Sequence, residues 1–170
     1  MNYTESLTNA MNELAKDPKT IFVGQSIRYP GQAMYSTLAS VPIERRFEMP
    51  VAEDFQMGFC TGLALAGFVP VCIYTRWDFL LIAANQLVNH LDKIPMMSEM
   101  RPKVIIRVAV APLAPLNGGP QHTQDHSDAF ASMLSTVDVV KLPDAESVQK
   151  AYANIERSTI MVEYMREYGR

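Results

Sequence analysis

The residues of this chain that could carry acid–base chemistry lie in two places, and the first is a single glutamate. Glu53 stands just before a helix-forming segment, residues 58–67, that is rich in small residues. Small residues let backbones approach closely, so we expect the carboxyl group to be drawn out of water, which raises its pKa and favours the protonated form. A protonated carboxyl group could donate to a ligand nitrogen. The simpler alternative is that Glu53 only stabilises the helix start, where acidic residues interact well with the dipole.

The second place is a pair of histidines, His122 and His126, which follow a Gly-Gly pair at the end of a proline-containing loop. On a helix, a spacing of four could bring both imidazoles to one metal ion, with Asp125 or Asp128 nearby. That geometry would suit a metal-dependent hydrolase, although the spacing supplies no third ligand. The simpler interpretation is a helix start capped by Thr123 or Asp125. His122 would then face a cleft as a proton carrier near neutral pH.

Several familiar catalytic and nucleotide-binding motifs do not occur in the chain. There is no Gly-x-Ser-x-Gly, no Gly-x4-Gly-Lys-Ser/Thr phosphate loop and no Gly-x-Gly-x-x-Gly after a strand. Cys60 and Cys72 lie in apolar runs without metal-like spacing, so we expect buried, reduced thiols. An aromatic cluster at residues 74–79 could offer a flat surface for a ring at a strand end, although aromatic residues at such a junction are more often core.

Composition and charge limit the classes of function. With 170 residues, 48% of them hydrophobic, the chain can bury one full core, and we expect a single domain over residues 1–170. The net charge of −3 and the dispersed basic residues predict no binding to nucleic acid. The first residues lack the pattern of a signal peptide, and no apolar run approaches the roughly 20 residues that span a membrane. We therefore expect a cytoplasmic protein.

Hydrophobic periodicity predicts helices and strands that alternate along the whole chain. The predicted helices cover residues 3–17, 53–66, 79–97, 125–134 and 144–157. The predicted strands cover residues 20–24, 46–48, 69–75, 103–110, 137–141 and 159–165. This alternation predicts a doubly wound α/β fold, with a mostly parallel sheet and helices on both faces. The predicted loop at residues 111–121 follows a strand, which is where open parallel sheets bind ligands.

Short segments in a particular order and spacing cover nearly the whole chain. They are Tyr3-Thr4-Glu5-Ser6-Leu7, Met49-Pro50-Val51-Ala52-Glu53, Gly62-Leu63-Ala64-Leu65-Ala66-Gly67-Phe68-Val69-Pro70-Val71, Asn85-Gln86-Leu87-Val88-Asn89, Lys93, Met97-Ser98 and Gln121-His122-Thr123-Gln124. In this order they resemble the transketolase-like pyrimidine-binding domain of thiamine-diphosphate enzymes. The resemblance is closest to the N-terminal half of the beta subunit of 2-oxo acid dehydrogenases, and it implies the thiamine-diphosphate-binding fold of the pyrimidine-domain type.

The resemblance implies definite roles for three residues. It places Glu53 where the family's glutamate hydrogen-bonds a ring nitrogen of the cofactor pyrimidine and so activates thiamine diphosphate. It places Phe79 where an aromatic side chain stacks on the pyrimidine, and His122 where a histidine faces the substrate and assists proton transfers. The implied enzyme is similar to a transketolase or a 2-oxo acid dehydrogenase, in which the cofactor supplies the carbanion chemistry.

The chain departs from the family pattern around the expected pocket. The family's Thr-Phe-Asn-Phe becomes Thr75-Arg76-Trp77-Asp78-Phe79, and a polar residue of the family becomes Ile82. Residues 110–117 replace an Arg-Gly-Pro-Asn-Gly stretch of the family, so a monovalent-ion site at that stretch is not expected to be kept unchanged.

The resemblance also implies a partner chain. The family's diphosphate-binding domain, with the Gly-Asp-Gly and the later Asn that hold magnesium, and the C-terminal domain of the beta subunit are both absent from residues 1–170. We therefore expect a split enzyme that is inactive alone, with no metal site of its own and with magnesium held mainly by a Gly-Asp-Gly…Asn chain in a dimer or mixed tetramer. The alternatives are a non-catalytic assembly module of the same fold and a metal-dependent hydrolase that uses His122 and His126.

Overall fold

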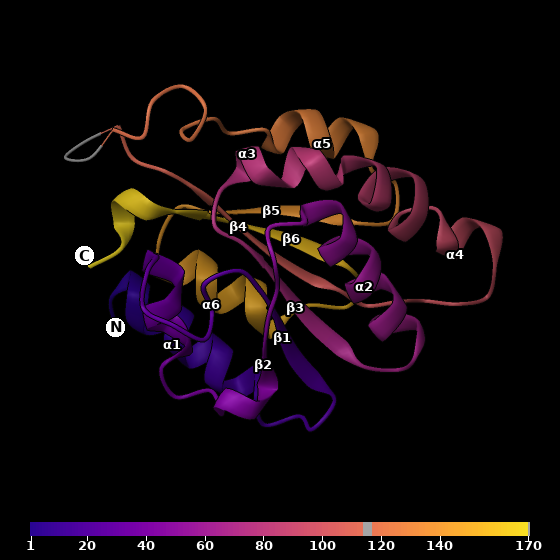
Figure 1. Cartoon of the computed structure of the whole chain (residues 1–170), viewed down its shortest axis with the longest axis horizontal. Helices are drawn as coiled ribbons and strands as arrows, with labels where there is room; N and C mark the ends of the chain where they lie inside the picture. Colours follow the sequence, from indigo (N-terminus) through magenta and orange to yellow (C-terminus); the bar gives the residue numbers. More distant parts are fainter. Residues whose placement is uncertain (114–116, 170) are drawn as a thin grey trace.

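The fold is built on one parallel sheet. The computed structural model describes residues 1–113 and 117–169, and in these residues six strands pair in the order β2-β1-β3-β4-β6-β5 (Figure 1). The strands are β1 (Thr20–Gly24), β2 (Arg46–Glu48), β3 (Val69–Tyr74), β4 (Ile105–Val110), β5 (Asp138–Leu142) and β6 (Thr159–Tyr164). Every neighbouring pair of strands is parallel.

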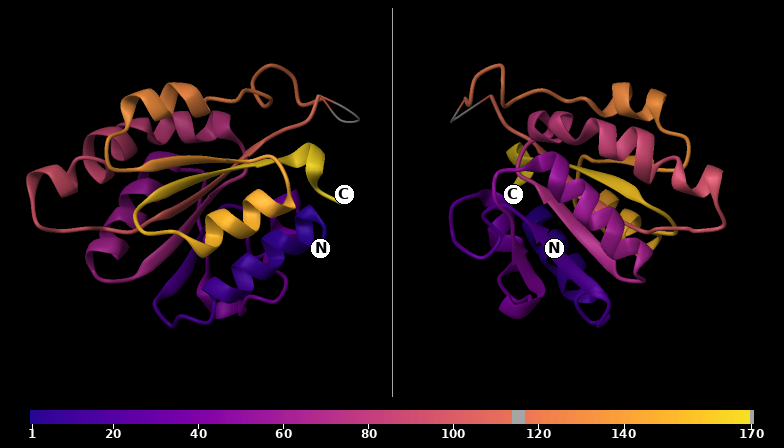
Figure 2. Two further views of the ribbon diagram at one scale, coloured as in Figure 1. Left: turned by 180° about the vertical axis from the view of Figure 1, so that it is seen from behind. Right: turned by 45° about the vertical axis from the view of Figure 1, so that its right-hand side comes forward.

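Helices cover both faces of the sheet (Figures 1 and 2). One face carries α1, α6 and the 3-10 helix η1, and the other carries α2, α3 and α5. The helices are α1 (Tyr3–Leu14), η1 (Ala33–Leu38), η2 (Ile43–Arg45), α2 (Glu53–Leu65), α3 (Trp77–Leu80), η3 (Leu81–Ala83), η4 (Gln86–Leu91), α4 (Ile94–Met97), α5 (Ser127–Met133), α6 (Ala145–Ala153) and η5 (Met165–Glu167). Across the described ranges, none of them is long and apolar enough to cross a bilayer. The predicted doubly wound α/β fold is confirmed.

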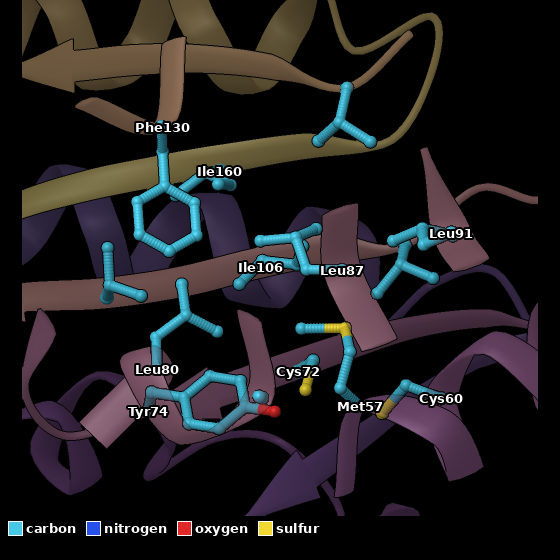
Figure 3. Close-up of a cluster of buried hydrophobic side chains, with 14 of the residues drawn as sticks. Met57, Cys60, Cys72, Tyr74, Leu80, Leu87, Leu91, Ile106, Phe130 and Ile160 are labelled. Carbon is cyan, nitrogen blue, oxygen red and sulfur yellow. The ribbon is translucent and has the colours of Figure 1, made fainter. Parts of the chain in front are cut away.

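An apolar core holds α2, α3 and α5 on the sheet (Figure 3). Cys72 and Ile106 project from the central strands toward Met57 on α2 and Phe130 on α5, and all four side chains are buried. Cys60 lies in the same core, and both cysteines are free, as the sequence predicts. Because burial disfavours a thiolate, the pKa of the Cys60 thiol is raised.

The helix predicted over residues 79–97 is confirmed in part, because residues 77–91 are helical but change from α to 3-10 to π geometry, and a turn at residues 92–93 separates them from α4. At the end of η4, the backbone N–H of Asp92 donates to the carbonyl of Leu87, five residues back, at 2.9 Å, which is the hydrogen bond of a π-helix. The Asp92 carboxylate accepts the backbone N–H groups of residues 135–137. Pro95, in the first turn of α4, has no N–H to continue a regular helix.

The boundaries of the predicted helix at residues 125–134 also differ from those observed. α5 begins at Ser127, because the Asp125 carboxylate accepts the backbone N–H of Ser127 at 3.0 Å and so forms a turn instead of a helical start. The predicted loop at residues 111–121 includes residues 114–116, which lie outside the described residues.

Candidate functional site

A small hollow lies at the carboxyl ends of β1 and β3, where open parallel sheets bind ligands. It is lined by Gln25, Glu53, Ile73, Tyr74, Thr75 and Phe79. Gln25 directly follows β1, Thr75 directly follows β3, and Glu53 is the first residue of α2. Three separate segments of the chain therefore contribute side chains to one place.

Glu53 is the buried carboxylate of this hollow. The residue is 6% exposed, and its carboxylate accepts no hydrogen bond from the described part of the chain. Glu53 and Asp54 both lie in the first turn of α2, where acidic side chains interact favourably with the dipole. That interaction does not require burial, so it does not by itself account for the buried position of Glu53.

The backbone that carries Glu53 is fixed to β3 by hydrogen bonds. The hydroxyl of Tyr74 donates to the carbonyl of Glu53 at 3.0 Å, and the side-chain amide of Gln56 donates to the carbonyl of Ile73 at 3.1 Å. Burial raises the pKa of the Tyr74 hydroxyl, which keeps it protonated as a donor. The backbone that carries the Glu53 carboxylate is thus fixed to a strand of the sheet by hydrogen bonds.

Phe79 and His122, which are 43 positions apart in the sequence, lie against each other. Their ring centroids are 5.6 Å apart and the ring planes meet at 80°. The approach of His122 depends on glycine, because a Cβ at Gly118 would lie 2.9 Å from the Cβ of His122. Gly119, with φ of 81°, then closes a turn in which its carbonyl accepts the backbone N–H of His122 at 3.1 Å. Glu53, Phe79 and His122 therefore gather at one edge of the sheet.

His126 does not share a helix face with His122. Its ring is 6.1 Å from that of Trp77, and its Nε2 is 3.8 Å from Oδ1 of Asp78. Both histidines precede α5, so the helical spacing that favoured a shared metal ion is wrong. In residues 1–113 and 117–169, no group of three or more His, Cys, Asp or Glu side chains could hold a metal ion.

Sequence reasoning missed Gln25 and the residue that holds its loop. The Glu48 carboxylate accepts the backbone N–H groups of Ile27 at 2.9 Å and Arg28 at 3.0 Å, and it also accepts that of Ser26. Ser26 has a φ of 54°, an uncommon value outside glycine. The position of Gln25 directly after a predicted strand was the signal that could have found it.

The chain matches known proteins over nearly its whole length. Residues 1–166 match the family described as transketolase, pyrimidine binding domain. The chain is 24% identical over 180 residues to the 2-oxoisovalerate dehydrogenase subunit beta of Bacillus subtilis, covering 99% of this chain and 53% of that protein. It is 26% identical over 175 residues to the mitochondrial pyruvate dehydrogenase E1 component subunit beta of Caenorhabditis elegans, covering 99% and 50%.

A solved structure shares the fold. The chain described as a split gene transketolase, inactive beta4 tetramer, superposes with a TM-score of 0.69 at 24% identity, covering 94% of this chain and 50% of that chain. The chain thus spans about half the length of the relatives it matches. The family match over nearly all residues confirms the resemblance found in the sequence, and the chain belongs to the family of transketolase pyrimidine-binding domains.

Proposed function

We propose that this chain is the pyrimidine-binding subunit of a split thiamine-diphosphate-dependent enzyme that acts on a 2-oxo acid or a ketose. The observation that carries the proposal is the convergence of Glu53, Phe79 and His122 at the carboxyl edge of the sheet. The names of the relatives support this class of reaction, because they include beta subunits of 2-oxo acid dehydrogenases and a split transketolase. A cytoplasmic location remains part of the proposal.

The residues at this edge fit the pyrimidine end of thiamine diphosphate. Glu53 offers a buried carboxyl group without an internal hydrogen-bond partner in the described ranges, and the half-buried ring of Phe79 lines the same hollow. When bound, thiamine diphosphate supplies the carbanion chemistry. Glu53 would hold a proton at a pyrimidine ring nitrogen, Phe79 would stack on the ring, and His122 would carry a proton at the substrate.

An exposed apolar surface beside the site supports the association that a split enzyme requires. Phe55 and Phe59 stack on α2 with centroids 6.1 Å apart, and Phe55 is exposed. Val51 and Ile82, which lie close in sequence to Glu53 and Phe79, are also exposed. Exposed apolar side chains that gather in one patch are typical of protein–protein contact. We propose that a Gly-Asp-Gly…Asn chain packs here and holds most of the magnesium, in a dimer or mixed tetramer.

The proposal is tested by reconstitution. The isolated chain should bind thiamine diphosphate weakly and show no turnover, because two phosphates and a magnesium ion need several oxygen ligands in near-octahedral array. Mixing it with a Gly-Asp-Gly…Asn chain should produce magnesium-dependent cofactor binding in calorimetry, together with turnover of a 2-oxo acid or a ketose. Tight, magnesium-dependent binding by the chain alone would contradict the split-enzyme proposal.

Replacing Phe79 with alanine should weaken cofactor binding more than it slows turnover. Stacking of an aromatic ring contributes on the order of 1 kcal/mol beyond burial, so we expect the apparent dissociation constant to rise about fivefold. The measurement is cofactor titration of the reconstituted enzyme. Phe68→Ala is the matched control, because Phe68 is a partly exposed phenylalanine that precedes β3 at the opposite end of that strand. Equal affinity in both variants would assign Phe79 to the core.

The exposed apolar surface also favours a second candidate, a non-catalytic assembly module of the same fold. Such a module would associate with its partner through α2 but would not use the carboxyl group of Glu53. The two candidates therefore differ in one result, since substitution of Glu53 would leave the assembly intact in both and would reduce turnover only in the enzyme.

A further inference from the structure

Three consecutive residues of α3 each contact a different residue of the segment that carries His122. The Trp77 ring meets the His126 ring, the Asp78 carboxylate accepts from Gln124, and the Phe79 ring meets the His122 ring. As the residue number rises along α3, the number of the contacted residue falls from 126 to 122. The start of α3 and residues 122–126 therefore lie side by side in antiparallel directions. The central contact of the three is a hydrogen bond, and Nε2 of His126 also lies 3.8 Å from Oδ1 of Asp78.

Asp78 is well placed to hold this segment. The side-chain amide of Gln124 donates to its Oδ1 at 2.7 Å, and the Asp78 side chain is 8% exposed. Within the described ranges, Oδ2 of Asp78 and Nε2 of His126 are buried and have no hydrogen-bond partner. A hydrogen bond to a carboxylate is about twice as strong as one between neutral groups.

In the part of the chain that the structure describes, the other hydrogen bonds of the segment do not reach α3. Thr123 donates through Oγ1 to the carbonyl of Gly119 at 3.1 Å, within the segment itself. Tyr164, at the end of β6, donates to Oδ2 of Asp125 at 3.0 Å. The first contact shapes the turn and the second anchors it to β6, so neither sets the distance between His122 and Phe79.

We propose that Asp78 is a positioning residue. It accepts a hydrogen bond from the side-chain amide of Gln124 and thereby holds the imidazole of His122 against Phe79 at the edge of the candidate site. The functional part of this inference rests on the proposed role of His122 as a proton carrier. The structural part does not, because the contact exists in the chain without cofactor or partner. Asp78 acts only through Gln124 and is not itself proposed to contact the cofactor or the partner chain.

The test reverses donor and acceptor across the contact. Gln124→Glu sets two carboxylates against each other and should release the segment. Asp78→Asn still offers an acceptor to the amide of Gln124 and should keep the contact. The double variant D78N/Q124E should restore it, because the new amide donates to the new carboxylate. Gln121→Glu is the control, since it adds the same charge to an exposed side chain of the same segment.

The readout is the NMR signal of the His122 ring in the isolated chain, at a pH of about 8, where histidine is ordinarily neutral. His122→Gln identifies the signal by removing it. We expect the ring-current shift from Phe79 to be lost in Q124E and kept in D78N, in D78N/Q124E and in the Gln121 control. Thermal unfolding of each variant checks that the fold is kept. An unchanged His122 signal in Q124E, or no recovery in the double variant, would overturn the proposal.

Turnover of the reconstituted enzyme gives an independent result. Q124E should lower kcat by about tenfold or more, as expected for a misplaced proton carrier, with cofactor affinity unchanged and with kcat recovered in D78N/Q124E. If no enzyme is reconstituted, the NMR result still decides the positioning role. If turnover is present but insensitive to Q124E, the positioning role fails while the proposed function stands.

Discussion

Replacing Glu53 with glutamine should reduce the turnover of the reconstituted enzyme by about 100-fold or more, which is the usual cost of losing one positioned proton partner. The substitution keeps the size of the side chain and removes only its ability to exchange a proton. The backbone contact from Tyr74 to the Glu53 carbonyl does not involve the side chain, so the fold should be kept. The measurements are steady-state kcat and the circular dichroism spectrum of the variant.

Asp54→Asn is the matched control for this prediction. Asp54 lies in the same first turn of α2 and interacts with the same dipole, but it does not line the hollow. If Glu53 acted only as a favourable charge at the helix start, both variants would lose a few tenths of a kcal/mol to 1 kcal/mol of stability and neither would lose turnover. Wild-type activity in Glu53→Gln would assign it to that structural role.

The centre of the sheet was predictable because β3 and β4 are buried on both faces. β3 and β4 read as near-continuous apolar runs, and their predicted ranges, 69–75 and 103–110, agree with the observed strands to within two residues. The helices of the same fold were predictable only where they are regular. The π geometry of η4 has no signal in the apolar pattern, and the Asp92 carboxylate that follows it bonds residues 135–137, a segment at least 43 positions away.

Three residues of the candidate site could be named from the sequence, but their contacts could not be predicted. Glu53, Phe79 and His122 could be named from the resemblance, and the structure brings them to one edge. The metal-site geometry failed because the Asp125 turn moves the start of α5 past both histidines, and short-range capping of this kind outweighs a four-residue spacing. The hydrogen bond between Asp78 and Gln124 has no local sequence signal, since the two residues are 46 positions apart.

Two charged residues inside predicted apolar strands form a buried pair. Arg107 on β4 and Glu163 on β6 are both fully buried, with Nε–Oε1 and Nη2–Oε2 distances of 2.5 and 2.9 Å. Thr37 accepts a further N–H of Arg107 at 3.1 Å, and the Tyr168 hydroxyl donates to Glu163. Burial alone would lower the pKa of Arg107, but the charge of Glu163 outweighs it and raises the pKa.

Glu163→Gln should therefore lower the free energy of unfolding by about 3 kcal/mol, because removing one partner leaves the guanidinium of Arg107 as an uncompensated buried charge. Asp138→Asn is the control, since it breaks the exposed pair of Asp138 with Arg157 and should cost less than about 1 kcal/mol. Both values come from urea denaturation at pH 7. Equal losses of stability in the two variants would mean that other groups solvate the buried charge.

The double variant Arg107→Met/Glu163→Leu should recover most of the stability, because an apolar pair of similar volume often replaces a buried ion pair without loss. If instead the double variant is less stable than Glu163→Gln, the surrounding hydroxyl groups of Thr37 and Tyr168 require the charges, and the pair organises the core between α1, η1 and the sheet.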